Sequence, residues 1–204
     1  MWQGNNEQAE EQFKLADDLF NQVDDIEYKA WHLARKATWY QETGKQELSE
    51  ETALAGLKLL QDNQFDDASL KGRYYNEMSA ANRHNDNDKA LLYNSRALDF
   101  AEILNGKNHP IYQQRLVNRA VVLLRLNRHT EAEKALKEAA IIAKKIYPDE
   151  HPDITQVIKE LAYFYHDKGH FNQAKSAYEQ SIALFLKSTG GNDTNYFKTI
   201  NNLA

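Results

Sequence analysis

The chain has 204 residues, of which 42% are hydrophobic and 27% charged, and its formal net charge is −5. This hydrophobic content is too high for a disordered chain, and the acidic balance argues against a nucleic-acid-binding protein, which needs an excess of positive charge. The sequence contains no cysteine, which excludes disulfides, thiolate nucleophiles and cysteine zinc sites and fits a reducing compartment.

The first predicted helix covers residues 4–22. Its small and apolar side chains recur in steps of four, three, four and three residues, which places them in one stripe along a helix. They are Ala9, Phe13, Ala16, Phe20 and Val23. The same steps occur in a later helix, at Ala132, Leu136, Ala139, Ala143 and Ile146. Because the later helix is the second of a predicted pair, residues 4–22 are interpreted as half of a repeat.

Four helix pairs are predicted after this half repeat. Their ranges are 27–42 with 46–61, 67–83 with 87–104, 110–126 with 130–146, and 152–167 with 171–187, and a final half repeat covers 194–204. The pairs follow from a 42-residue period, in which His109-Pro110 recurs as His151-Pro152. Small residues recur at the same interval, at Ala120, Ala162 and Ala204, at Ala90, Ala132 and Ala174, and at Ala97, Ala139 and Ser181. Such a period is the signature of a stacked repeat protein.

The predicted helix ends carry residues that begin and end helices. Pro110 and Pro152 fall in first helical turns, where a missing N–H costs nothing, and we expect His109 and His151 to cap these helices. Asp193 is the predicted N-cap of the last helix. Gly and Asn tolerate the left-handed conformation that ends many helices. The turns within the four pairs contain Gly44, Asn85, Asn127 and Gly169.

The repeated residues resemble the tetratricopeptide repeat family. The pattern of that family is a small residue, a Tyr three positions later, a Gly turn, then Ala, an aromatic residue or Leu, and Ala. The matching residues are Ala162, Tyr165, Gly169, Ala174, Tyr178 and Ser181, and also Ala37, Tyr40 and Gly44. The period, the His-Pro loops and the closing Asn201-Asn202-Leu203-Ala204 resemble the kinesin light chain type, which also occurs in bacterial signalling proteins.

The resemblance implies an all-α, right-handed superhelix of about four full helix pairs plus a half repeat at each end. We therefore expect a single solenoid domain over residues 1–204, as a fragment of a longer protein. In this family the first helices of the pairs line a concave groove, and the groove binds extended peptides or partner helices. A solenoid suits this role because a small rotation per repeat builds a long concave surface.

The resemblance also implies which side chains face the groove, counted from the small residue of each first helix. In the pair 67–104, where Met78 takes the place of the small residue, these are Tyr75, Asn76, Ser79, Asn82 and Arg83. In the pair 110–146 they are Val117, Asn118, Val121, Leu124 and Arg125. In the pair 152–187 they are Lys159, Glu160, Tyr163, His166 and Asp167.

Asparagine recurs at one of these positions, as Asn76, Asn118 and Asn202. An amide both donates to and accepts from a peptide backbone, which suits sequence-tolerant binding. The alternative is that each amide bonds to the neighbouring repeat. In the fourth pair Glu160 takes this position, and together with Asp167 it argues against an acidic ligand there.

Two further residue types are candidates for ligand contact. Arg83 and Arg125 share a position, and a guanidinium can bind a ligand carboxylate in a bidentate manner, although each arginine could equally be solvated or form a local salt bridge. Tyr75 and Tyr163 are candidate aromatic anchors for a partner. The alternative for both tyrosines is packing between helices.

The sequence contains no motif for catalysis or for a cofactor. The patterns GxGxxG, GxxxxGK[ST], HExxH and GxSxG are all missing from it. His166 and His170 are four residues apart, but Gly169 separates them and the second begins a new helix, so no metal site is predicted. We therefore expect no cofactor, no metal site, no catalytic residue and no enzymatic activity.

The leading functional prediction is a protein–protein interaction module that binds a peptide or partner segment in the groove. The alternative is a regulatory or sensor segment of a multidomain signalling protein, attached for example to a kinase or protease-like domain. The first 25 residues lack an apolar run of signal-peptide length, and no run of about 18 apolar residues occurs, so we expect a cytoplasmic protein without a membrane partner. Apolar faces at the ends of the fragment also predict end-to-end self-association.

Overall fold

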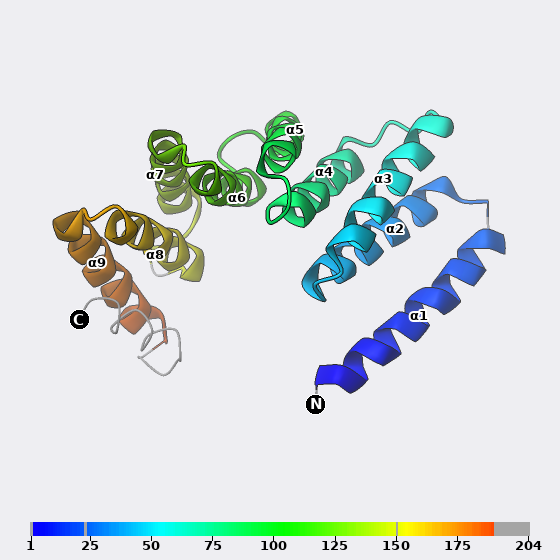
Figure 1. Cartoon of the computed structure of the whole chain (residues 1–204), viewed down its shortest axis with the longest axis horizontal. Helices are drawn as coiled ribbons and strands as arrows, with labels where there is room; N and C mark the ends of the chain where they lie inside the picture. Colours follow the sequence, from blue (N-terminus) through cyan, green and yellow to red (C-terminus); the bar gives the residue numbers. More distant parts are fainter. Residues whose placement is uncertain (1, 23, 150, 190–204) are drawn as a thin grey trace. The chain divides into compact units, whose positions relative to one another are not determined.

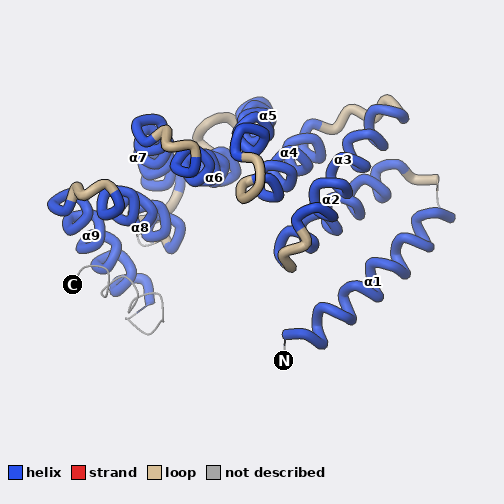
Figure 2. Tube along the Cα trace, in the orientation of Figure 1, coloured by secondary structure: helices blue, strands red, loops and turns tan. Residues whose placement is uncertain are grey.

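The computed structural model describes residues 2–22, 24–149 and 151–189, and within these ranges the protein is all-α (Figures 1 and 2). Nine helices and no strand occur there: α1 (Trp2–Gln22), α2 (Ile26–Glu42), α3 (Gln46–Asp62), α4 (Ala68–Asn82), α5 (Asn87–Asn105), α6 (Pro110–Arg125), α7 (His129–Ile146), α8 (Pro152–Asp167) and α9 (Phe171–Thr189). The predicted fold class is confirmed, and every predicted boundary among these helices agrees to within two residues. The last half repeat, with Asp193 and Asn202, lies outside the described residues.

The chain divides into two compact units, residues 1–104 and residues 105–204. In the first unit α2 packs on α3, and α4 packs on both of them. In the second unit α6 packs on α7, α7 on α8 and α8 on α9. Each predicted pair within these stacks is joined by a short turn, which brings its two helices side by side. The prediction of a single domain over residues 1–204 stays a prediction.

The repeated small residues lie inside the stacks, where helices approach one another closely. All of the following are buried: Ala90, Ala97, Ala101, Ala120, Ala132, Ala139, Ala143, Ala162, Ala174 and Ser181. A methyl group fills the space between two closely packed helices without forcing their axes apart, which is why this spacing predicts the packing. The corresponding stripe on α1 differs, because Ala9, Phe13, Ala16 and Phe20 are only half-buried.

The predicted histidine caps are confirmed. The Nδ1 atom of His109 accepts the backbone N–H of Ile111 at 3.2 Å, and Nδ1 of His151 accepts that of Asp153 at 3.2 Å. Both histidines have extended backbone conformations and precede a proline at the first helical position. The imidazole therefore satisfies an N–H group that the helix itself leaves without a partner.

Three of the four predicted left-handed turn residues are confirmed. Gly44, Asn127 and Gly169 have φ angles of +77°, +57° and +71°. After Gly44 the backbone N–H of Lys45 donates to the carbonyl of Tyr40 at 2.8 Å, which closes the helix end. The same arrangement recurs after Asn127 and after Gly169.

The prediction for Asn85 is wrong, because this residue does not have a positive φ angle. The turn between α4 and α5 covers residues 83–86, one residue more than the turns between the other pairs. It closes instead through the backbone N–H groups of Asn85 and Asp86, which both donate to the carbonyl of Asn82, at 3.1 and 2.8 Å. The extra residue removes the need for a left-handed conformation.

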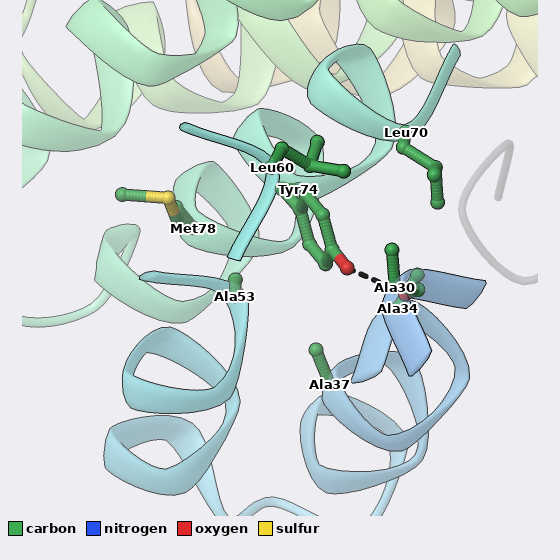
Figure 3. Close-up of a cluster of buried hydrophobic side chains, with 8 residues drawn as sticks. All are labelled: Ala30, Ala34, Ala37, Ala53, Leu60, Leu70, Tyr74 and Met78. Atoms are coloured by element: carbon green, nitrogen blue, oxygen red, sulfur yellow. Dashed lines mark hydrogen bonds between the residues drawn. The ribbon is translucent and has the colours of Figure 1, made fainter. Parts of the chain in front are cut away.

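Tyr74 of α4 lies at the centre of the core of the first unit (Figure 3). Its side chain is fully buried, and its hydroxyl donates to the carbonyl of Ala30 in α2 at 2.5 Å. Burial raises the pKa of Tyr74, so the hydroxyl remains a donor. The surrounding residues are Ala30, Ala34, Ala37, Ala53, Leu60, Leu70 and Met78. Met78, which replaces the small residue of the repeat, thus also packs in the core.

Candidate partner-binding face

The predicted contact residues fall on one side of α4 in the first unit, and on one side of α6 and of α8 in the second unit. Each of these sides, taken helix by helix, is called here a first-helix face. Two of the predicted contact residues on α4 are buried within the pair. The hydroxyl of Ser79 donates to the carbonyl of Ala90 in α5 at 2.9 Å, and the Asn82 amide donates to the carbonyl of Met78 at 2.9 Å. Ser79 thus bonds across the pair and Asn82 bonds within α4, and because both side chains are buried we exclude them from the candidate surface. Arg83 is half-buried at the end of α4.

The two candidate tyrosine anchors both pack against the second helix of their own pair. The ring of Tyr75 stacks on Phe100 of α5 with centroids 5.9 Å apart and an interplanar angle of 11°. The ring of Tyr163 meets Tyr178 of α9 edge-on at 5.8 Å. Each candidate tyrosine keeps a half-exposed side chain. Packing between helices, the alternative for both residues, thus describes their position, and only their outer edges remain for a partner.

A polar network that the sequence reasoning missed joins α2 and α4 beside Asn76. The carboxylate of Glu77 is buried, and its Oε1 atom lies 3.1 Å from the Thr38 hydroxyl of α2. The Thr38 hydroxyl also accepts from the Arg73 guanidinium at 3.1 Å. The Asn76 amide donates to the same Glu77 oxygen at 3.4 Å. The signal was available, since Glu77 follows Tyr74 by three residues and so falls on the buried side of the helix.

The face of α6 combines an apolar stripe with two polar groups. Val117, Val121 and Leu124 follow one another in steps of four and three residues, and all three are half-buried. Asn118 beside them is half-buried, and Arg125 at the end of the helix is exposed. The neighbouring residues Leu116, Ala120 and Leu123 are buried in the core. The apolar surface of α6 is therefore wider than the part that its own stack covers.

The face of α8 is more polar and carries a partly desolvated carboxylate. Glu160 accepts a hydrogen bond from the Gln156 amide at 2.7 Å, and burial raises the pKa of the Glu160 carboxyl despite the nearby Lys159 cation. Lys159 is half-buried, and His166 is exposed with its ring 6.0 Å from that of Phe171. Asp167 is exposed and pairs with Lys168, whose hydrogen bond lowers the pKa of Asp167.

The first-helix faces carry apolar, amide and singly charged side chains. Apolar stripes, amides and single charges on rigid helices are the groups that hold a peptide segment. In the part of the chain that the structure describes, no three His, Cys, Asp or Glu side chains gather where they could hold a metal ion. Within the same ranges, none of the helices combines the length and the apolar character that crossing a bilayer requires.

Comparisons with known proteins agree with this architecture. Residues 112–187 match the model of the tetratricopeptide repeat family. Curated relatives are the clustered mitochondria protein homologs of Aspergillus terreus and Aspergillus fumigatus, which are 26% and 27% identical to this chain over 110 residues. The match covers 52% of this chain, and the chain spans only 8% of the length of these relatives.

Solved structures resemble nearly the whole chain. BtubC from P. vanneervenii has a TM-score of 0.80 and 18% identity, over 97% of this chain and 80% of that protein. The TPR-like repeats of a Podosopora anserina protein described as a kinesin light chain have a TM-score of 0.73 and 16% identity. This likeness covers 89% of this chain and 86% of that protein. A Rap protein complexed with Competence and Sporulation Factor has a TM-score of 0.78 and 20% identity. This likeness covers 98% of this chain and 57% of the Rap protein.

The family match and the fold together confirm the predicted family. The match covers the pairs α6–α7 and α8–α9, in which the 42-residue period and the histidine caps are found. The structural likeness extends the same fold to the helices of the first unit. Residues 112–187 are therefore tetratricopeptide repeats, and the chain as described has the all-α fold of tetratricopeptide proteins.

Proposed function

We propose that this chain is a protein-interaction module and that the first-helix faces of α6 and α8, in the second unit, bind a peptide or an extended segment of a partner. The observation that carries the proposal is the half-exposed stripe of Val117, Val121 and Leu124 on α6, with Asn118 and Arg125 beside it. Support also comes from the Rap protein of similar fold, which was solved in complex with Competence and Sporulation Factor. In this proposal the chain acts by holding its partner and carries out no reaction.

The physical basis is a division of roles along α6. Covering the three apolar side chains with a partner removes apolar surface from water, which is worth about 25 cal/mol per Å². The Asn118 amide can pair with one peptide unit of an extended partner, and Arg125 can bind an acidic side chain. We therefore expect the part of the partner on α6 to combine apolar and acidic residues. On α8, the desolvated Glu160 favours a cationic or N–H donor group.

A selection from a random peptide library, followed by fluorescence anisotropy with the selected peptides, tests this proposal. The double variant Asn118→Ala with Arg125→Ala should weaken binding about tenfold or more, which corresponds to about 1.4 kcal/mol. The same variant should also reduce the dependence of binding on salt. Lys134→Ala, which removes an exposed cation of α7, is the matched control and should bind like the wild type. Unchanged affinity and salt dependence in the double variant, with unchanged helicity, contradict the assignment.

A second candidate function is a regulatory or sensor segment of a multidomain signalling protein. It is favoured by the Rap comparison, because the matching region makes up 57% of that chain and the remaining 43% lies outside it. This candidate predicts that a selected peptide changes the activity of a domain joined to these repeats. An assay of the full-length protein with and without the peptide tests it, and equal activity in both cases contradicts it.

A further inference from the structure

The first unit contains a separate open cleft between α1 and α2, with a volume of about 690 Å³. The lining side chains that carry the argument are Phe13, Ala16 and Phe20 of α1, and Tyr28, Trp31 and Arg35 of α2. From its shape and charge we propose that this cleft binds a small organic carboxylate with an aromatic or aliphatic body. The inference is independent of the peptide-binding proposal, because it uses none of the residues of the first-helix face on α4, α6 or α8.

Polar contacts and a few aromatic contacts hold α1 beside α2, and Phe13 of α1 lies 5.2 Å from the Trp39 ring of α2, centroid to centroid. The Asp17 carboxylate lies 2.7 Å from Nε2 of His32 and 2.5 Å from Nζ of Lys36. Nearer the start of α1, the Lys45 ammonium donates to Glu10 at 2.9 Å. The first four residues of the equivalent stripe on α7 are buried, whereas their counterparts on α1 remain half-exposed along the cleft.

The walls of the cleft are predominantly aromatic. Phe13 and Phe20 flank the His32 ring, with centroids 5.8 and 4.8 Å from it, and Trp31 lies on the same side of α2. Ala16, between the two phenylalanines on α1, is what leaves the space open. Sites for small molecules typically have volumes of about 300 to 1,000 Å³, with apolar walls and a few polar groups. The body of the ligand should therefore be apolar and of the size of one or two rings.

The positive charge of Arg35 at the mouth of the cleft determines which polar group of a ligand is favoured there. Arg35 is exposed, and within the described ranges no ion pair or hydrogen bond of its side chain is found. The nearby acids Glu10 and Asp17 are paired with Lys45 and Lys36, and no acidic side chain lines the cleft in the described part of the chain. An unpaired guanidinium beside an apolar wall favours an anion, and its planar fork matches a carboxylate.

Isothermal titration calorimetry with 2-naphthylacetate and its neutral amide tests the proposal, because the two probes share one apolar body. We expect the carboxylate to bind the wild-type chain at least fivefold more tightly than the amide. Arg35→Gln should bring the ratio of the two affinities close to one while leaving the amide affinity unchanged. Lys58→Gln, which removes an exposed cation of α3, is the control and should keep the wild-type ratio. The proposal is overturned if neither probe binds at millimolar concentration, or if Arg35→Gln keeps the ratio.

A second variant tests whether the cleft itself is the site. Ala16→Leu fills the space between Phe13 and Phe20, so it should abolish binding of both probes while the helicity stays unchanged. If Ala16→Leu lowers the helicity, Ala9→Leu is used as the filling variant, because Ala9 also lines the cleft. Wild-type affinity in a folded filling variant would overturn the assignment. The double variant Asn118→Ala with Arg125→Ala should bind the carboxylate with wild-type affinity. The small-molecule proposal and the peptide-binding proposal can therefore each fail while the other holds.

Discussion

Gly56 of α3 lies so close to the ring of Tyr74 that a Cβ atom at residue 56 would stand 2.1 Å from Cζ of the tyrosine. The tyrosine cannot move away easily, because its ring is fully buried and its hydroxyl is bonded to the carbonyl of Ala30 (Figure 3). A glycine in the middle of a helix lowers helix stability by roughly 1 kcal/mol relative to alanine. The glycine at this position of α3 therefore leaves room for the Tyr74 side chain of α4, which contacts both α2 and α3.

Replacing this glycine should destabilise the protein in spite of the better helix former. Gly56→Ala gains about 1 kcal/mol of helix propensity, but the clash forces the Tyr74 ring or α3 to shift, which costs about 1 to 3 kcal/mol. We expect a net loss of up to about 2 kcal/mol in urea unfolding. Ala55→Gly, at the exposed neighbouring position, should lose only about 0.5 to 1 kcal/mol. A more stable Gly56→Ala protein would show that the ring has room to move.

The contact of Asp17 with His32 and Lys36 should make the docking of α1 sensitive to acid. Burial tends to raise the pKa of Asp17, but hydrogen bonds from Lys36 and His32 more than offset it, so the pKa is lowered in the folded state. A carboxyl with a lowered pKa contributes stability above its unfolded pKa of about 3.9, and this stability is lost as the pH falls through the folded value. We therefore expect the contribution of Asp17 to be complete at pH 7 and to decline below about pH 4, as the pH falls toward the folded pKa.

The variant Asp17→Asn isolates this contribution. At pH 7 it should lower the free energy of unfolding by about 1.5 to 3 kcal/mol, the range for hydrogen bonds to charged groups. At pH 3 the difference between the urea midpoints of the wild type and the variant should be smaller than at pH 7, because the pH then lies below the unfolded pKa of Asp17 and nearer to its lowered folded pKa. Asp18→Asn, at the exposed neighbouring position, is the control and should change little at either pH. A difference between Asp17→Asn and wild type that is equal at both pH values would exclude the ionic contact as its cause.

The histidine caps of α6 and α8 should each stabilise the fold. His109→Ala and His151→Ala remove the acceptor for a backbone N–H, and each should cost about 1 kcal/mol in thermal or urea unfolding. His109→Asp should retain most of the stability, because a carboxylate is a good acceptor at this position. Asn108→Ala, at the exposed residue just before the cap, serves as a control. Equal stability of His109→Ala and His109→Asp would mean that capping is not what His109 contributes.

The turn between α3 and α4 offers a stabilising substitution. Gln64 has a φ angle of +53°, a conformation that is strained for a residue with a side chain of this kind. Gln64→Gly should therefore raise the free energy of unfolding by about 0.5 to 1 kcal/mol. Asn127→Gly should gain less, because asparagine tolerates the same conformation at its φ of +57°. Differential scanning calorimetry checks the order of the two melting temperatures, and a Gln64→Gly protein that melts below the wild type contradicts the argument.

Tertiary contacts account for what sequence reasoning missed on the first-helix face. Ser79 was expected to meet a ligand, yet it bonds to a carbonyl 11 residues away in the partner helix. Tyr75 is predicted to contact a ligand, and its ring is stacked on Phe100 of the partner helix. The buried Glu77 depends on Thr38, 39 residues earlier in the chain. A repeat pattern predicts the side of a helix on which a residue lies. It does not predict which residue of a neighbouring helix that residue contacts.

The sequence by itself determined the helices, their ends and their pairing, because these depend on signals within one or two helical turns. The alanines spaced along Ala132, Ala139 and Ala143, and the histidine before Pro110, act locally and recur with the period. Only the tertiary structure decided that α1 stands off from α2 to leave a cleft. The reason is that the cleft results from a balance between ion pairs such as Asp17 with Lys36 and apolar packing across two helices, and this balance is set by side chains that lie far apart in the chain.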